Sequence, residues 1–252
     1  MIAPEMPSEP GTFATQQSLL SQFRRHFRCS HADQITDSST DSGLGVITID
    51  LVESLDAYRE RLRVHLREPY RTMLGHFRHE VGHYYQNVLV ETGDGAGRYL
   101  YECRDLFGDE RANYQAEVER HYAYGALPNW TDSYISEYAT MHPWEDFAEC
   151  FAHYLHITDT IDTAREAGLV LQADKVRFAV PHDIVPLESY DDVPIERLLY
   201  DWKWLALFFN RVNSAMGKAP LYPFEIPPPV VRKLGFVHRV IRETASHAVT
   251  LP

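Results

Sequence analysis

The chain has 252 residues, of which 44% are apolar, and this is enough to bury the core of one sizeable domain. Its net charge of −12 at neutral pH argues against nucleic acid or a membrane surface as a partner, because both favour clustered lysine and arginine. Three cysteines without a C-x-x-C pair exclude a disulfide framework and a cysteine zinc cluster, so a reducing, cytoplasmic compartment is expected.

The first 43 residues are predicted to be a flexible segment, with a short helix over 18–27. Residues 1–17 contain three prolines and do not have the charge pattern of a signal peptide. Serine, threonine and aspartate predominate in 35–45, which indicates a loop. No apolar run approaches membrane-spanning length. One folded domain is therefore expected over 44–252.

Most of this domain has helical periodicity, whereas residues 46–51 are rich in β-branched side chains and are the strongest strand signal. The predicted fold class is therefore α+β and mostly helical, with a small N-terminal sheet. The glycine-rich segment 91–97 is predicted to be a turn, because it lacks the lysine of a phosphate-binding loop. The predicted helices cover residues 55–66, 70–90, 98–107, 110–124, 143–157, 160–168, 194–216 and 228–244.

The predicted helix 70–90 contains the motif H-E-x-x-H. On a helix His79 and His83 lie one turn apart on the same face, and Glu80 projects beside them. Apolar residues recur at helical spacing around the motif, and no proline interrupts it. Two imidazoles that can reach one ion, with a carboxylate beside them, are typical of a zinc hydrolase in which the glutamate is the general base.

A catalytic zinc ion takes three protein ligands, so a further ligand is expected on another element. Pro143 suits the first turn of a helix, and Glu145 and Asp146 suit its positive end. Glu145 and Glu149 would share one face, with alanines beside them that permit close approach to the glycines of the first helix. We assign Glu145 as the third metal ligand and Glu149 as the acceptor that orients a ligand imidazole, with Asp146 in the same second layer. The reverse assignment of the two glutamates stays open.

Two alternatives to a hydrolase remain. Glu80 and His83 also form the E-x-x-H of carboxylate-bridged di-iron bundles, but that architecture needs a second such motif, and no other glutamate has a histidine three residues later. The other alternative is a catalytically silent zinc-binding scaffold or protein-interaction module. Glu80 binds no metal in the zinc scheme, so its presence favours catalysis. Taken singly, each of these side chains could equally be an ordinary structural residue.

Three stretches together resemble a bacterial family of zinc-binding metallopeptidases of the zincin, or gluzincin, type: E-P-Y-R-T-M-L-G-H-F-R-H-E-V-G-H-Y-Y, L-F-G-D-E-R-A-N-Y and Y-A-T-M-H-P-W-E-D-F-A-E-C-F-A-H-Y-L-H-I. The likeness covers roughly residues 45–243. It implies a zincin-like catalytic domain over 44–252, helical from about 158 onward, with one catalytic zinc ion and a peptide or protein substrate. Many members carry an N-terminal zinc ribbon of paired cysteines. This sequence has no such pair, so no role of the ribbon is carried over.

Residues 138–149 are also similar in layout to the lethal factor metallopeptidase of anthrax, in which a tyrosine precedes E-F-F-A-E and the first glutamate binds zinc. This resemblance implies that Glu145 is the ligand and that Tyr138 assists catalysis. The alternative for Tyr138 is an ordinary packed aromatic. In the resulting hypothesis, zinc activates a water, Glu80 takes its proton, and Tyr138 shares the charge on the substrate oxygen. Substrate preference and oligomeric state are not predicted.

Overall fold

The structure, a computed structural model, describes residues 72–249 and the backbone of the segments 28–30, 40–41 and 46–50. The helices predicted over 18–27 and 55–66 lie outside the described residues. The division of the chain at residue 44 stays a prediction.

The described helices follow the predicted ones, with three differences. The helix expected over 70–90 changes to a π-helical turn after Tyr85, and the predicted turn 91–97 is helical. The helices predicted over 143–157 and 160–168 are a single helix, because no glycine or proline interrupts the chain between them. The elements are α3 (Met73–Tyr85), the π-helical turn η2 (Gln86–Glu91), α4 (Gly93–Arg98), α5 (Leu100–Phe107), α6 (Tyr114–Tyr124), the 3₁₀ turns η3 (Trp130–Asp132) and η4 (Tyr138–Thr140), α7 (Pro143–Glu166), α8 (Ile195–Ala215) and α9 (Pro228–Val249).

The predicted α+β class with a small N-terminal sheet is wrong. Where the structure describes side-chain burial, 64% of the residues are helical and 1% are in strand geometry, and no sheet takes part in this packed region. In the described segments before residue 72, β3 (Val46–Asp50) pairs with β1 (Arg28–Ser30) and β2 (Thr40–Asp41). Partners of three and two residues are at or below the lower end of the usual strand length. Residues 46–50 are therefore a strand, as their β-branched side chains predicted, but the packed helical region is built without a sheet.

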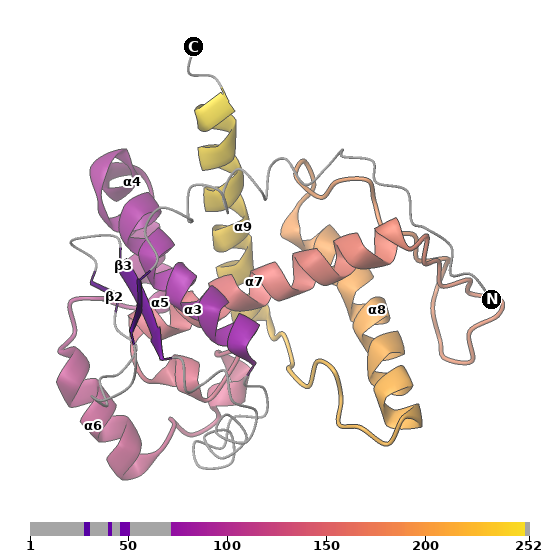
Figure 1. The fold of residues 1–252 in the computed structure, drawn as a ribbon, viewed down its shortest axis with the longest axis horizontal. Helices are drawn as coiled ribbons and strands as arrows, with labels where there is room; N and C mark the ends of the chain where they lie inside the picture. Colours follow the sequence, from indigo (N-terminus) through magenta and orange to yellow (C-terminus); the bar gives the residue numbers. More distant parts are fainter. Residues whose placement is uncertain (1–27, 31–39, 42–45, 51–71, 250–252) are drawn as a thin grey trace.

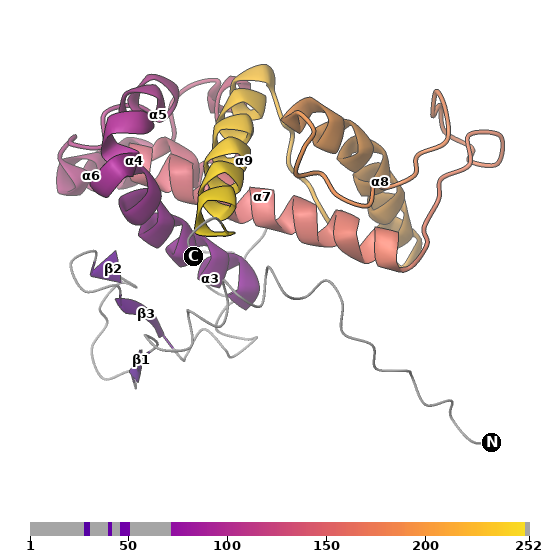
Figure 2. The ribbon, with the colours of Figure 1, turned by 90° about the horizontal axis from the view of Figure 1, so that it is seen from above.

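The long helix α7 runs through the molecule (Figures 1 and 2). Helices α4, α5 and α6 gather around its N-terminal end, α8 packs at a steep angle against its C-terminal half, and α3 and α9 cross it between them. Three buried phenylalanines join α5, α7 and α9: the ring centroid of Phe107 is 5.4 Å from that of Phe147 and 5.9 Å from that of Phe236. Burying such a side chain stabilises the fold by about 1.5–3 kcal/mol, so this contact fixes the N-terminal half of α7. None of the described helices is long and apolar enough to cross a membrane.

Helices α3 and α7 touch at a glycine. A Cβ atom added to Gly82 would lie 2.9 Å from the Cα atom of Ala148 and 3.1 Å from its carbonyl oxygen. The backbones can approach this closely only because Gly82 has no side chain and Ala148 has a small one. This contact brings the H-E-x-x-H motif against the first turns of α7, as the small residues on both helices predicted.

Candidate metal centre

Helix α3 presents the two motif histidines to α7. The helix begins at Met73 because the Thr72 hydroxyl accepts a hydrogen bond from the Gly75 N–H at 2.9 Å and caps the free end. His79 is buried, and the side chain of His83 is 18% exposed. The motif therefore lies at the helix–helix contact, with His83 closer to solvent.

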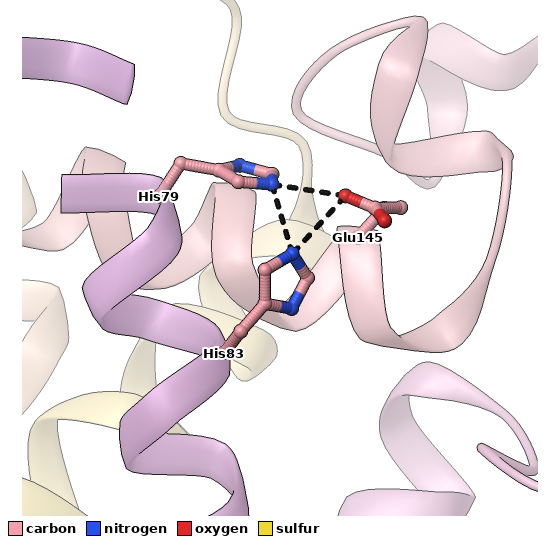
Figure 3. Close-up of side chains that lie close together, drawn as sticks. All are labelled: His79, His83 and Glu145. Carbon is pink, nitrogen blue, oxygen red and sulfur yellow. Dashed lines mark hydrogen bonds and ion pairs between the residues drawn. The ribbon is translucent and has the colours of Figure 1, made fainter. Parts of the chain in front are cut away.

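Helix α7 supplies the carboxylates from its first two turns. Pro143 occupies the first helical position, as predicted. The residue before it caps the helix: the His142 Nδ1 atom accepts the Trp144 N–H at 3.1 Å. Glu145 is 2% exposed and its side chain points towards the imidazoles of α3, as Figure 3 shows.

Three ligand atoms from these helices converge. The His79 Nε2 atom lies 2.9 Å from Glu145 Oε2 and 3.1 Å from His83 Nε2. The third side of the triangle, from His83 Nε2 to Glu145 Oε2, is 3.4 Å (Figure 3). The structure thus brings together the three residues predicted as metal ligands.

The donor set suits zinc. Two imidazole nitrogens and one carboxylate oxygen are ligands that zinc takes in catalytic sites. Ligands about 2.1 Å from a tetrahedral ion lie about 3.4 Å from one another, which is close to the three separations found here. The residues present therefore fit a zinc ion with three protein ligands.

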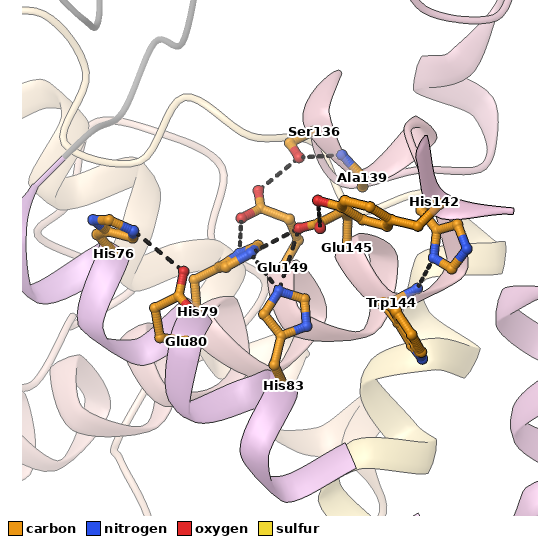
Figure 4. A network of polar contacts seen from close by, with 11 residues as sticks. His76, His79, Glu80, His83, Ser136, Ala139, His142, Trp144, Glu145 and Glu149 are labelled. Carbon is orange, nitrogen blue, oxygen red and sulfur yellow. Dashed lines mark hydrogen bonds and ion pairs between the residues drawn. The ribbon is translucent and has the colours of Figure 1, made fainter. Parts of the chain in front are cut away.

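A second layer of polar groups holds His79 from behind. Its Nδ1–H donates to Glu149 Oε1 at 2.8 Å, and this leaves Nε2 free to face the other ligand atoms (Figure 4). Glu149 accepts in turn from the Ser136 hydroxyl at 2.6 Å, and Ser136 accepts from the Ala139 N–H at 3.1 Å. Glu149 thus lies where the assignment of Glu145 as ligand and Glu149 as orienting acceptor requires it.

The buried carboxylates and the His79 imidazole shift one another's pKa. Burial opposes the charged imidazole, but hydrogen bonds to Glu145 and Glu149 outweigh it and raise the pKa of His79 well above its ordinary value. For Glu145, burial is outweighed by the charge of His83 and the hydrogen bond to His79, and the pKa falls well below 4.5. For Glu149, burial is outweighed by His79, and the pKa falls to about 2. The site therefore holds negative charge that favours a cation.

Glu80, the predicted general base, lies beside this group on α3. It is 5% exposed, and its Oε1 atom is 3.3 Å from the Nε2 atom of His76. Burial alone would raise its pKa, but the hydrogen bond to His76 and the charges of His79 and His83 lower it. Glu80 is therefore ionised at neutral pH and able to accept a proton.

Tyr138 also lies at the site, with its ring centroid 5.7 Å from that of His79. Burial and the neighbouring Glu145 carboxylate raise the pKa of Tyr138 well above 10, so its hydroxyl stays a proton donor. The position is compatible with the role that the resemblance implied, which stays a prediction.

Asp146 lies elsewhere than expected. Its carboxylate accepts from Lys233 of α9 at 2.5 Å and from the Cys150 thiol at 3.8 Å. On a helix, neighbouring side chains point about 100° apart, so Asp146 is turned away from the face that carries Glu145 and Glu149. The structure therefore does not bring Asp146 together with the predicted metal ligands.

Residues that the sequence did not single out also line the site. They are Tyr114, whose hydroxyl donates to Glu145 Oε1 at 2.9 Å, and Ser136. Tyr114 ends the stretch L-F-G-D-E-R-A-N-Y, so its place in a family motif could have indicated it. Ser136 stands in no recognisable pattern.

Two histidines one turn apart and a carboxylate from a second helix define the class of the molecule, a helical protein with three side chains placed to hold a metal ion. The chain belongs to the family described as "Putative zinc-binding metallo-peptidase", whose sequence pattern matches residues 12–240.

Uncharacterized proteins of mycobacteria are similar to it. The proteins Rv2568c of Mycobacterium tuberculosis (strain H37Rv) and Mb2598c of Mycobacterium bovis are each 44% identical over 207 residues, which is 80% of this chain and 55% of theirs. The chain thus spans about half the length of the curated relatives it matches. No solved structure matches it.

Proposed function

We propose that this protein is a zinc-dependent metallopeptidase, a hydrolase of peptide bonds in peptides or proteins. The observation that carries the proposal is the convergence of His79, His83 and Glu145, with Glu80 beside them. Membership of the metallopeptidase family supports the same reaction class.

In the proposed mechanism His79, His83 and Glu145 hold one zinc ion. When bound, zinc supplies Lewis acidity, which lowers the pKa of a water towards about 7 and polarises a carbonyl. Glu80 takes the proton of the attacking water and passes it to the leaving amine. Tyr138 donates a hydrogen bond to the substrate oxygen as negative charge develops on it.

The surrounding residues keep this arrangement fixed. Glu149 holds the Nδ1–H of His79, so the imidazole offers Nε2 and cannot rotate away. His76 holds Glu80 by its Oε1 atom and supports the ionised state that a base needs. We place this activity in a reducing compartment such as the cytoplasm, in keeping with the free, buried thiols of Cys103 and Cys150.

The experiment that tests this proposal compares the wild type with Glu80→Gln, His83→Ala and, as a control, the exposed Glu119→Gln. Zinc per chain is measured by elemental analysis, and cleavage of a mixed peptide library by mass spectrometry. We expect about one zinc ion per wild-type chain, loss of zinc in His83→Ala, and retained zinc with at least about 100-fold slower cleavage in Glu80→Gln. Glu119→Gln should behave as the wild type.

A zinc-loaded wild type that cleaves no faster than Glu80→Gln would remove the peptidase and leave the silent zinc-binding scaffold. A wild type that takes up two iron ions in preference to zinc would favour the di-iron alternative.

A further inference from the structure

The carboxylate of Glu145 is held from two sides. Its Oε2 atom faces the imidazoles of His79 and His83, at 2.9 Å and 3.4 Å from their Nε2 atoms. Its Oε1 atom accepts the hydroxyl of Tyr114, at 2.9 Å. Tyr114 comes from α6, so a third helix takes part in orienting this side chain. The two oxygens therefore have different partners, and one of them faces away from the metal ligands.

The position of Tyr114 is itself fixed by the cap of α7. Because His142 accepts the Trp144 N–H at Nδ1, its proton is on Nε2, which donates to the carbonyl oxygen of Ala112 at 3.1 Å. The rings of Tyr114 and His142 are also in edge contact, with centroids 5.2 Å apart. One imidazole thus ties the start of the helix that carries Glu145 to the chain just before Tyr114.

We propose that Tyr114 is a positioning residue for the metal ligand Glu145. By holding Oε1, its hydroxyl leaves Oε2 alone to face the metal, so that Glu145 binds through one oxygen and a coordination position stays open for water. Without the hydroxyl, the carboxylate can rotate and bind through both oxygens or turn away. This inference rests on the proposed zinc site, and assigns Tyr114 no contact with substrate.

The structure separates this role from a merely structural one. Tyr114 is 37% exposed, and α6 has no buried residue, so the loss of one hydroxyl removes little packing. Tyr114→Phe should therefore keep its melting temperature within about 2 °C of the wild type. Tyr124→Phe makes the same change on the same helix, at a residue that is 85% exposed, and is the matched control.

The test is zinc affinity, measured by competition with a chromophoric chelator on the full chain. We expect Tyr114→Phe to bind Zn²⁺ about 10-fold more weakly than the wild type and Tyr124→Phe to bind it equally well. The visible spectrum of the Co²⁺-loaded protein should also change in Tyr114→Phe alone, because a second carboxylate oxygen raises the coordination number.

Equal zinc affinity and equal Co²⁺ spectra of Tyr114→Phe and the wild type would overturn the inference while the proposed function stands, whatever the cleavage rate of the variant. If neither the wild type nor Tyr124→Phe binds zinc, the proposed function itself fails and takes this inference with it. If Tyr114→Phe loses affinity only together with its fold, as shown by circular dichroism, the residue is structural and the inference is also overturned.

Discussion

Helix α7 carries buried or half-buried carboxylates on two faces, and the two faces differ in the group that neutralises the negative charge. Towards α3, Glu145 and Glu149 meet imidazoles, and the pKa of each carboxylate falls below 4.5. Towards α9, Asp146 meets the ammonium group of Lys233, yet burial outweighs this charge and raises the pKa of Asp146 to about 7. The pKa values of carboxylates about one helical turn apart are thus shifted in opposite directions.

This difference suits the face towards α3 to binding a cation and the face towards α9 to holding α7 in place. The face towards α3 groups several acceptors around histidines that can lose their protons, so its charge can be compensated by a metal ion. The face towards α9 is closed by one lysine, whose ammonium group also donates to the Ser133 carbonyl oxygen at 2.9 Å and lies over the Tyr134 ring. A buried pair with these additional partners fixes the position of α7 and leaves no coordination position.

Removing the lysine that pairs with Asp146 should give the largest loss of stability. Lys233→Met leaves Asp146 buried without its cation, and we expect the free energy of unfolding to fall by about 3 kcal/mol at pH 7.5, measured with denaturant. The loss should be smaller at pH 5.5, because Asp146 then takes up a proton. Arg239→Met, on the same helix in an exposed pair with Glu102, should cost less than about 1 kcal/mol. An equal fall in the free energy of unfolding in both variants would contradict the structural role of the pair between Lys233 and Asp146.

The contact between α3 and α7 can be tested at its closest point. A Cβ atom at position 82 would meet the backbone of Ala148, so Gly82→Ala should cost about 2 kcal/mol and weaken zinc binding, since the helices must move apart. Gly97→Ala is the control, because a Cβ atom there meets no atom of the described residues within 4 Å and the residue is in a helix. Unchanged zinc affinity in a destabilised Gly82→Ala would show that the ligands do not depend on this contact.

The same helix pair holds a second histidine whose pKa moves the other way from that of His79. His156 accepts from Arg78 at 2.7 Å, and burial and the nearby positive charges lower its pKa from 6.5 to about 3. As the pH falls below 6.5, the unfolded chain therefore takes up a proton at this histidine that the folded chain does not. The contribution of His156 to the free energy of unfolding is highest above pH 6.5 and decreases as the pH falls towards 3. We expect His156→Gln, which keeps an acceptor for Arg78, to reduce the decline between pH 6 and 4.5 by about 1 kcal/mol per pH unit. Parallel pH curves of the two proteins would contradict this.

The parts of the site that were predictable depend on local helix geometry. His79, Glu80 and His83 are fixed relative to one another by one helical turn, and Glu145 and Glu149 likewise. Small residues on both helices indicated where they would meet. The sequence therefore predicted which side chains the structure brings together, although their roles stay predictions.

The contacts that the sequence did not predict join segments that are far apart in the chain. Lys233 is 87 residues from Asp146, and nothing in the spacing of acids shows which of them will face a third helix. Tyr114 and Ser136 each act through one hydroxyl group, and such contacts have no periodicity in the sequence. The sheet was predicted from β-branched residues alone, yet a strand contributes to a fold only where partners of sufficient length exist.

The smallest expected effect concerns how the two helices begin. Helix α7 is capped by His142, which also ties it to α6, whereas the Thr72 hydroxyl caps α3. Thr72→Ala should therefore lower the free energy of unfolding by about 1 kcal/mol, while Thr72→Ser should restore it, since serine keeps the acceptor. Zinc affinity should hardly change, because His79 lies two turns further along α3 and is fixed there by Glu149. If Thr72→Ala weakens zinc binding as much as Gly82→Ala does, the positions of the imidazoles depend on the start of α3 at least as much as on its contact with α7. The contact between α3 and α7 would then not be enough to hold the metal ligands in place.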